Sequence, residues 1–227
     1  MFNIDAYMVK LIDLLKQTFG NHLSYVGLQG SYFRGEADEE SDIDVMVILD
    51  ELSIADMKRY KDILHQLGSS DKACGFLCGK ADLQSWNPLE ICHLLHTTKD
   101  YYGMLKTFIP AYSENDIKKY IQFSLDNLYH ALCHRYIHSS QEECKLNLPG
   151  LYKPVFFILQ NMHFLKSGNF IQTQSALLPL LSEDDRRILQ KAMELRGHPS
   201  IDSHHFEETF ALLFHWCQIA KQKTLHF

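Results

Sequence analysis

Apolar positions in the first half of the chain change between the spacing of a helix and that of a strand. Residues 4, 8, 11, 12 and 15 are apolar at helical intervals, whereas residues 43–49 form a short apolar run that fits a buried strand. Gly, Ser and Pro punctuate these segments where turns and caps are expected. In order, we expect helix 4–18, strand 22–29, strand 43–49, helix 53–67, strand 76–86 and helix 87–96. This order predicts a small mixed sheet with helices packed on it.

From Ser113 onward the pattern is helical throughout. We expect Ser113 to cap a long helix and Pro149-Gly150 to separate it from a second helix over 151–165. Further helices are expected over 172–181, 182–195 and 203–224. The sequence thus predicts an α+β chain: a mixed-sheet domain over 1–110 and an all-α helical bundle over 111–227.

Two carboxylates stand out where the second strand begins. The segment Ser41-Asp42-Ile43-Asp44-Val45 alternates acidic and apolar residues, so Asp42 and Asp44 should point to one face and the apolar residues to the core. Acids two apart on a strand lie about 7 Å from one another and can hold a divalent metal that also binds a triphosphate. Most Asp-x-Asp pairs bind nothing, but here Gly30-Ser31 follows a strand and precedes the pair, as the chemistry requires.

The motif Gly30-Ser31, ten intervening residues and Asp42-Ile43-Asp44 resembles the signature of the DNA polymerase β-like nucleotidyltransferase superfamily. The fuller form, Gly-Ser-x-x-Arg-Gly-Glu and then Ser-Asp-Ile-Asp, is similar to small bacterial members, among them aminoglycoside nucleotidyltransferases and minimal nucleotidyltransferases. The Leu94–Gly103 region and the segment with Tyr152-Lys153 resemble kanamycin-nucleotidyltransferase-like proteins with a helical C-terminal domain.

The resemblance implies that Asp42 and Asp44 hold Mg²⁺, two ions being expected, and that a third carboxylate comes from a later strand beside the pair. Asp82 fits that third place, as metal ligand or general base, if residues 76–86 form a strand. The alternative is that Asp82 is an ordinary surface acid. Glu36 and Glu90 are rivals for the role of base.

The nucleotide is expected at the glycine-serine turn. Backbone N–H groups of Gly30 and Ser31 can bind the β- and γ-phosphates, with the Ser31 hydroxyl as a further donor. Arg34 can reach phosphate or brace an acid such as Glu36 or Asp42; the alternative is an ordinary surface salt bridge. Ser41 either orients a carboxylate or starts the strand. In the resembling proteins a lysine of the helical domain reaches the triphosphate, a role that falls to Lys153; taken alone, such a lysine is solvated.

Composition narrows the range of partners. The formal net charge of −6 argues against binding driven by a basic face, so nucleic acid is not expected as a partner. Six scattered cysteines match no zinc-site spacing, and neither a signal peptide nor a membrane-spanning apolar run is found. These features favour a cytoplasmic protein with free thiols and no membrane partner. A homodimer is compatible with the sequence, which leaves the oligomeric state open.

The reading that joins these features is an Mg²⁺-dependent nucleotidyltransferase that moves a nucleoside monophosphate, AMP by preference, from an NTP such as ATP to a hydroxyl. The acceptor is a small molecule such as an aminoglycoside-like antibiotic, or a protein side chain. A polycationic acceptor needs acids, and those of the helical half are Glu114, Asp116, Asp126, Glu142 and Glu143. Two alternatives stay open: an antitoxin-type minimal nucleotidyltransferase that modifies or masks a partner, and an inactive nucleotide-binding relative.

Overall fold

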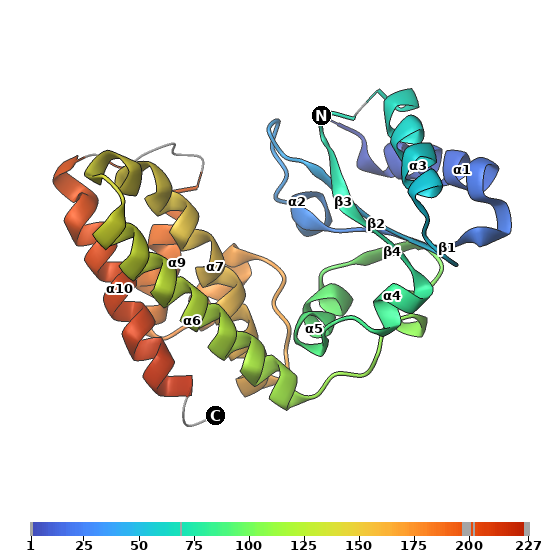
Figure 1. Cartoon of the computed structure of the whole chain (residues 1–227). Coiled ribbons are helices and arrows are strands. Elements are labelled where there is room, and N and C mark those ends of the chain that lie inside the picture. Colours follow the sequence, from blue (N-terminus) through green and yellow to red (C-terminus); the bar gives the residue numbers. More distant parts are fainter. Residues whose placement is uncertain (1, 69, 197–200, 202, 225–227) are drawn as a thin grey trace. The chain divides into compact units, whose positions relative to one another are not determined.

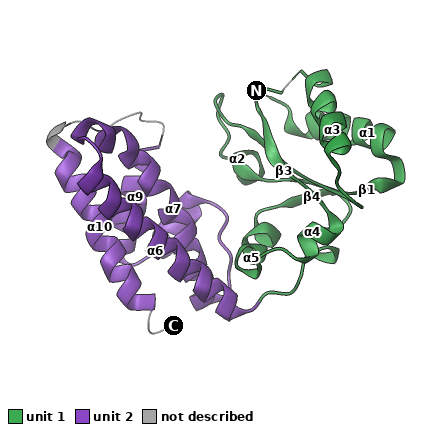
Figure 2. Ribbon diagram, in the orientation of Figure 1, with its two compact units in different colours: residues 1–112 green, residues 113–227 purple. Residues whose placement is uncertain are grey.

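The computed structural model describes residues 2–68, 70–196, 201 and 203–224. The chain divides into two compact units, Met1–Tyr112 and Ser113–Phe227 (Figures 1 and 2). The first unit holds all the strands of the described residues, and the second is helical. The chain is therefore α+β, as the sequence predicts.

The first unit is built on a four-stranded sheet with the strand order β3-β2-β1-β4. Strand β1 is antiparallel to both β2 and β4, and β3 is parallel to β2. The elements are α1 (Ile4–Phe19), a 3₁₀ turn (Gly20–His22), β1 (Leu23–Leu28), α2 (Gly30–Arg34), β2 (Ile43–Leu49), α3 (Ile54–Gln66), β3 (Ala73–Gly79), α4 (Lys80–Gln84), α5 (Pro88–His96), β4 (Lys99–Tyr102) and a 3₁₀ turn (Leu105–Thr107).

Strand β2 has the predicted bounds because its side chains are buried on both faces of the sheet. Ile43, Val45, Val47 and Leu49 pack against α1 and α3 in one cluster. On the opposite face Met46 and Ile48 join a second cluster of buried residues from β1, β3, α4 and the turn after β4, which comprises Tyr25, Cys78, Leu83 and Leu105. Burial of each such aliphatic side chain contributes about 1.5–3 kcal/mol, so the position of β2 is firmly fixed.

The expected strand over 76–86 is wrong in its second half. Strand β3 ends at Gly79, and the chain turns at once into α4, where the Asp82 carboxylate accepts a hydrogen bond from the Gly79 N–H at 2.9 Å. Ala81 and Leu83 alternate with the polar residues Lys80, Asp82 and Gln84, a pattern that is typical of a strand. The glycine followed three residues later by an acid is instead the start of a helix.

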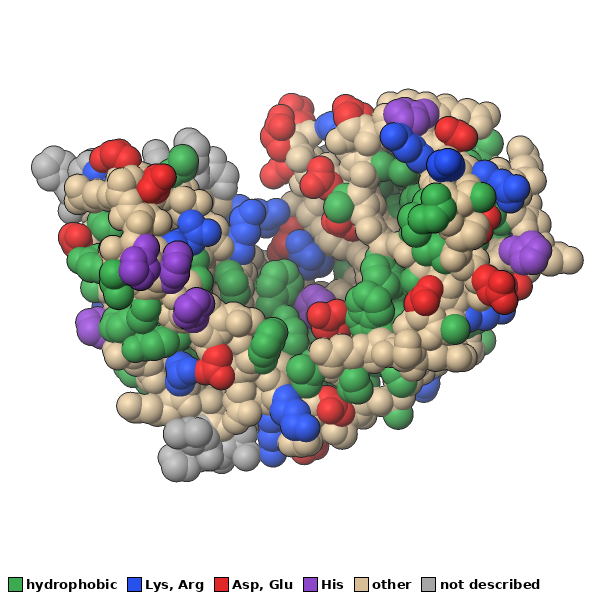
Figure 3. Space-filling view, in the orientation of Figure 1, with side chains coloured by type: hydrophobic (Ala, Val, Ile, Leu, Met, Phe, Trp, Pro, Cys, Tyr) green, Lys and Arg blue, Asp and Glu red, His purple; other side chains and the backbone are tan. Residues whose placement is uncertain are grey.

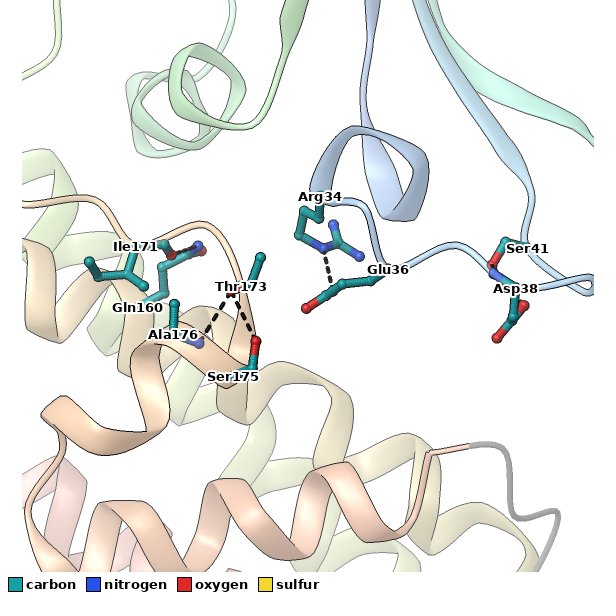
Figure 4. Close-up of polar contacts among 9 residues, drawn as sticks. All are labelled: Arg34, Glu36, Asp38, Ser41, Gln160, Ile171, Thr173, Ser175 and Ala176. Carbon is teal, nitrogen blue, oxygen red and sulfur yellow. Dashed lines mark hydrogen bonds and ion pairs between the residues drawn. The ribbon is translucent and has the colours of Figure 1, made fainter. Parts of the chain in front are cut away.

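The helical unit contains two long helices and several shorter ones. Its elements are α6 (Glu114–His138), α7 (Gln141–Ser167), α8 (Gln174–Leu177), a 3₁₀ turn (Leu178–Leu180), α9 (Glu183–Glu194) and α10 (Ser203–Thr224). Ser113 caps α6 as predicted, in a capping box with Asp116, and the αL residue Gly168 ends α7. Nearby, the Gln160 side chain donates to the Ile171 carbonyl at 2.6 Å and holds the segment after α7 (Figure 4).

The expected break at Pro149-Gly150 is also wrong, because α7 runs through it. The break lies earlier in the sequence, where Ser140 and Glu143 form a capping box and start α7. A proline removes one helical hydrogen bond, which normally disfavours a helix interior. Here the buried stripe Cys144, Leu148, Tyr152 and Val155 continues across the proline, and its packing outweighs that local cost.

Two further observations bear on the chain's environment. All six cysteines are free, and four of them are buried. In the part of the chain that the structure describes, no helix combines the length and the apolar character needed to cross a bilayer.

Candidate active site

Strand β2 presents the two acids where it begins. Asp42 directly precedes β2 and is exposed, and Asp44 is the second residue of the strand and half-buried. Their neighbours Ile43 and Val45 are 1% and 2% exposed, which holds this end of the strand against the core. The acids therefore share the face on which Met46 and Ile48 are buried further along, and they mark the place where that core opens to solvent.

Gly30 lies directly against the Asp44 carboxylate. A Cβ added to Gly30 would overlap Asp44 Oδ2 and would lie 2.7 Å from its Cγ, and the φ of Gly30 is +68°, which few other residues adopt. The adjacent Gln29 N–H donates to the Asp44 carbonyl at 2.8 Å. The glycine-serine turn and the second acid of the motif, which the loop after α2 separates in the sequence, thus meet at one point.

Asp44 has an electrostatic environment that suits a ligand for a cation. Burial and the negative charge of Asp42 raise the pKa of the Asp44 carboxyl above its ordinary value, against opposing effects of the Cys74 thiol and the Arg34 charge. A carboxyl with a raised pKa gains from a nearby positive charge, because the charge favours its ionised form. The negative charge of Asp42 therefore acts on the Asp44 carboxyl.

As the pH is lowered, we expect this site to lose its affinity for a divalent metal at a higher pH than a site with an ordinary aspartate would. Only the ionised carboxylate is a ligand, and the pKa of Asp44 lies above the usual 3.8, so affinity should rise as pH rises through that raised pKa. Titration of Mn²⁺ followed by electron paramagnetic resonance, from about pH 4 to about pH 7, measures this. An affinity that stays constant down to about pH 4 would contradict it.

Cys74 is the residue beside Asp44 on the neighbouring strand. In the parallel pair β2–β3, Asp44 is in register with Cys74, and the thiol hydrogen-bonds to the Asp44 carboxylate. This is the position from which a third carboxylate would complete the pair, and this chain has a thiol there. Sequence reasoning missed it, because a single cysteine carries no signal until the register between the two strands is known.

Asp82, the predicted third carboxylate, is not beside the pair. Register in β2–β3 runs from Ile43↔Ala73 to Leu49↔Gly79, so Asp82 follows the end of β3 that is opposite to Cys74. The two ends are separated by most of the length of the strand, about 16 Å. The carboxylate of Asp82 is instead bound to the Gly79 N–H. The structure therefore contradicts the placement of Asp82 in a strand beside the pair, on which its predicted role as a metal ligand or base depended.

An acid introduced at position 74 should strengthen the site. We expect Cys74→Asp to bind divalent metal more tightly, by about 10-fold or more, because it adds a carboxylate in register with Asp44. Cys74→Ser, which keeps a small polar side chain without the charge, is the matched control and should bind as the wild type does. Mn²⁺ titration compares the three proteins, and equal affinities for all three would show that position 74 does not face the metal.

Arg34 and Ser41 brace the loop between α2 and β2. The Arg34 Nε pairs with Glu36 Oε2 at 2.9 Å, and both side chains are 18% exposed (Figure 4). Ser41 Oγ donates to Asp38 Oδ1 at 2.8 Å and accepts from the Asp38 N–H, so it closes a turn before the acids (Figure 4). Of the rival bases, Glu36 is thus engaged with Arg34. Glu90 accepts a hydrogen bond from the Trp86 indole at 2.8 Å.

In the helical unit, Lys153 is exposed in the middle of α7, since that helix starts at Gln141 rather than near position 151. Its neighbour Tyr152 is buried and donates to the Thr209 carbonyl at 2.7 Å. Four of the five acids that might have lined an acceptor pocket have structural partners instead. Asp116 and Glu143 cap helices, Asp126 pairs with Lys221, and Glu142 pairs with Lys145.

The residues present fit Mg²⁺ in the way that nucleotide-dependent sites do. No three His, Cys, Asp or Glu side chains of the described residues converge to form a complete metal cage. Mg²⁺ commonly takes only one or two carboxylates and completes its octahedron with phosphate oxygens and water. Asp42 and Asp44 can supply that number of ligands, and Gly30 at the start of α2 lies against the second of them.

Comparison with known proteins supports this reading. The nucleotidyltransferase domain family matches residues 8–73, a range that includes Gly30, Ser31, Asp42 and Asp44. No curated protein matches the chain in sequence. Among solved structures, the spectinomycin adenyltransferase AAD(9) from Enterococcus faecialis, solved with ATP and spectinomycin, superposes with a TM-score of 0.57 at 14% identity. The match covers 96% of this chain and 98% of that one.

Two toxin–antitoxin structures resemble the chain more weakly. One was solved with AMP-PNP and has a TM-score of 0.32 at 21% identity, over 57% of this chain and 92% of its own. The MntA-HepT toxin–antitoxin has a TM-score of 0.31 at 19% identity, over 59% and 93%. At these scores neither bears on the function of this chain. Residues 8–73 thus match the nucleotidyltransferase domain family, and the chain has the fold of the AAD(9) adenyltransferase.

Proposed function

We propose that the chain transfers a nucleoside monophosphate, with AMP as the favoured group, from an NTP to a hydroxyl of a small molecule and releases pyrophosphate. The observation that carries the proposal is the contact of the Asp44 carboxylate with Gly30 of the glycine-serine turn. This contact places the acids of β2 beside the N-terminus of α2. The first N–H groups of a helix have no hydrogen-bond partner within that helix and can bind phosphate. The nucleotidyltransferase domain match over the same residues supports this reading.

In the proposed reaction the acceptor oxygen attacks the α-phosphorus, the bond from that phosphorus to the pyrophosphate oxygen breaks, and the hydroxyl proton passes to a base. Bound Mg²⁺ would neutralise charge on the phosphates and on the entering and leaving oxygens. Asp42 and Asp44 hold the cation. The backbone at Gly30 and Ser31, with the Ser31 hydroxyl, positions the β- and γ-phosphates. Arg34 adds a positive charge near Asp44.

We retain Lys153 as a nucleotide-binding residue in this proposal, because it is an exposed cation for which no salt bridge is found among the described residues. We expect Lys153→Ala to raise the KM for the NTP by about 10-fold and to change kcat less, since it removes a charge that binds triphosphate before and during the reaction. Initial rates at varied NTP concentration measure this. Lys119→Ala, which removes an exposed lysine of α6, is the control; equal KM values in the two variants would remove Lys153 from the site.

The acceptor that the structure favours is a cation. A cavity of about 890 Å³ in the first unit lies beside α2 and the loop that leads to Asp42. Its lining includes the exposed acids Asp38, Glu39 and Glu40 and the ring of Tyr32. Acidic side chains beside an aromatic ring suit an aminoglycoside-like polyamine with several hydroxyls. The solved AAD(9) structure contains the antibiotic spectinomycin, which makes antibiotics of this kind the first acceptors to test.

The proposal is tested by incubating the chain with Mg²⁺, each of the common NTPs in turn and a panel of aminoglycosides, with release of pyrophosphate and product mass as readouts. We expect a product whose mass exceeds that of one acceptor by one nucleoside monophosphate, with ATP giving the highest rate. Transfer to a protein in a cell lysate, with none to the panel, would replace the acceptor class. No pyrophosphate release with any acceptor would contradict the transferase proposal.

One observation favours a second candidate function. The thiol of Cys74 stands in the register position beside Asp44, where a third carboxylate would serve catalysis. A chain with a thiol at this position can bind a nucleotide and a metal without transferring the nucleotide. The Cys74→Asp variant separates the candidates: transfer that appears only in this variant would assign the natural chain to nucleotide binding without catalysis.

A further inference from the structure

A row of three histidines lies along the surface of α6. His130, His134 and His138 follow one another at intervals of four residues, and all three are exposed. Figure 3 shows histidine side chains gathered on the surface of the helical unit. Residues four apart lie on one face of a helix, one turn above the other. The exposed residues Phe123 (60%) and Ile137 (70%) fall on the same face by this spacing.

The rings of neighbouring histidines in this row are in contact range. The centroids of His130 and His134 are 5.9 Å apart, and those of His134 and His138 are 4.9 Å apart. Over the described residues, none of the three imidazoles has a hydrogen-bond or ion-pair partner, so their nitrogens are available as ligands. His134 belongs to both pairs.

Two imidazoles at this spacing form a chelate for a metal ion. A helix that places histidines at i and i+4 on one face can direct both rings to one zinc ion. Imidazole nitrogen suits Zn²⁺, Ni²⁺ and Cu²⁺, and affinity at such a site is highest for Cu²⁺. All three rings cannot bind the same ion, because eight residues of helix span about 12 Å. This agrees with the finding that no three ligating side chains converge within the described residues.

We propose that α6 carries a binding site for one late first-row transition-metal ion, held by His134 together with either His138 or His130. The shorter separation makes His134 and His138 the better pair. Two protein ligands leave coordination positions open for water or for a donor from outside the chain. The site differs in chemistry from the acids of β2, because nitrogen ligands select transition metals and oxygen ligands select Mg²⁺.

Because His134 belongs to both histidine pairs, its replacement should lower the metal affinity more than replacement of His130 or His138. With the full chain, purified without an affinity tag, we expect one Cu²⁺ per chain bound to imidazole, seen as nitrogen modulation in pulsed electron paramagnetic resonance. Loss of even an outer partner of a ligating imidazole lowers metal affinity about 10- to 100-fold, so His134→Ala should lower it at least about 10-fold. His130→Ala and His138→Ala each leave one pair and should lower it less.

His215→Ala is the matched control, because His215 is an exposed histidine of α10 with Ala211 and Ile219 at the positions four residues away. Its Cu²⁺ affinity should equal that of the wild type. Copper held by the acids of β2 gives no imidazole signal, so the spectra distinguish the two sites. The proposal would be overturned if His134→Ala kept the imidazole signal and the Cu²⁺ affinity of the wild type. It would also be overturned if His215→Ala lowered the Cu²⁺ affinity as much as His134→Ala does.

Discussion

Replacement of Asp44 by asparagine is expected to reduce nucleotidyl transfer by at least about 10³-fold, because the amide cannot supply the charge that holds the cation against the phosphates. Asp44 is the acid in contact with Gly30 and the one whose pKa is raised by burial. Asparagine has nearly the same shape, so the packing of β2 should be retained. Pyrophosphate release at saturating NTP and Mg²⁺ measures the effect.

In the absence of metal, the free energy of unfolding of Asp44→Asn should be higher than that of the wild type. In the wild type the raised pKa means that folding disfavours the ionised form, so stability is lost as pH rises through that pKa. The asparagine side chain of Asp44→Asn has no charge to bury and lacks this loss, so thermal unfolding near neutral pH should occur at a higher temperature. Asp13→Asn, at an exposed position of α1, is the control and should change neither quantity. Full transfer activity in Asp44→Asn would remove Asp44 from the site.

Gly30→Ala is expected to reduce transfer by about 10²-fold or more and to destabilise the fold. The methyl group would overlap the Asp44 carboxylate, which must shift, and a displacement of about 1 Å at a reacting centre can cost about 10²-fold in rate. The positive φ of Gly30 adds backbone strain of about 1–3 kcal/mol for a residue with a side chain. Steady-state rates and denaturant unfolding measure the two effects separately.

Gly168→Ala separates strain from overlap. Gly168 has a φ of +72°, close to the +68° of Gly30, but an added Cβ there meets no atom within 4 Å. The control should therefore lose a similar amount of stability from strain and should keep its transfer rate. A Gly30→Ala enzyme as active as Gly168→Ala would mean that the Asp44 carboxylate need not lie against the turn.

The elements that sequence alone predicts well are those whose local signals agree with their packing. The bounds of β2 follow from an apolar run that only Asp44 interrupts. Ser53 and Ser113 cap α3 and α6 because each has an aspartate three residues later. Two of the errors have the opposite cause. At Gly79 an alternating pattern imitates a strand, and at Pro149 the packing of α7 overrides the local preference of proline.

The site is predictable in part for the same reason. Gly30, Ser31, Asp42 and Asp44 form a motif within one hairpin, and the antiparallel pairing of β1 with β2 brings its two ends together. The neighbour of Asp44 on β3 depends on the register of the parallel pair β2–β3, whose strands are connected by α3. The packing of the two core clusters sets this register, and the local sequence does not encode it. For this reason sequence alone favours Asp82 over Cys74 as the neighbour of the pair.

The central claim is that Asp42 and Asp44 bind a divalent cation together with a nucleotide. Its most direct test is Mn²⁺ binding, followed by electron paramagnetic resonance, with and without a non-hydrolysable ATP analogue, in the wild type and in Asp44→Asn. We predict that the analogue increases Mn²⁺ affinity in the wild type and that Asp44→Asn loses this increase. Equal Mn²⁺ binding by both proteins in the presence of the analogue would contradict the claim.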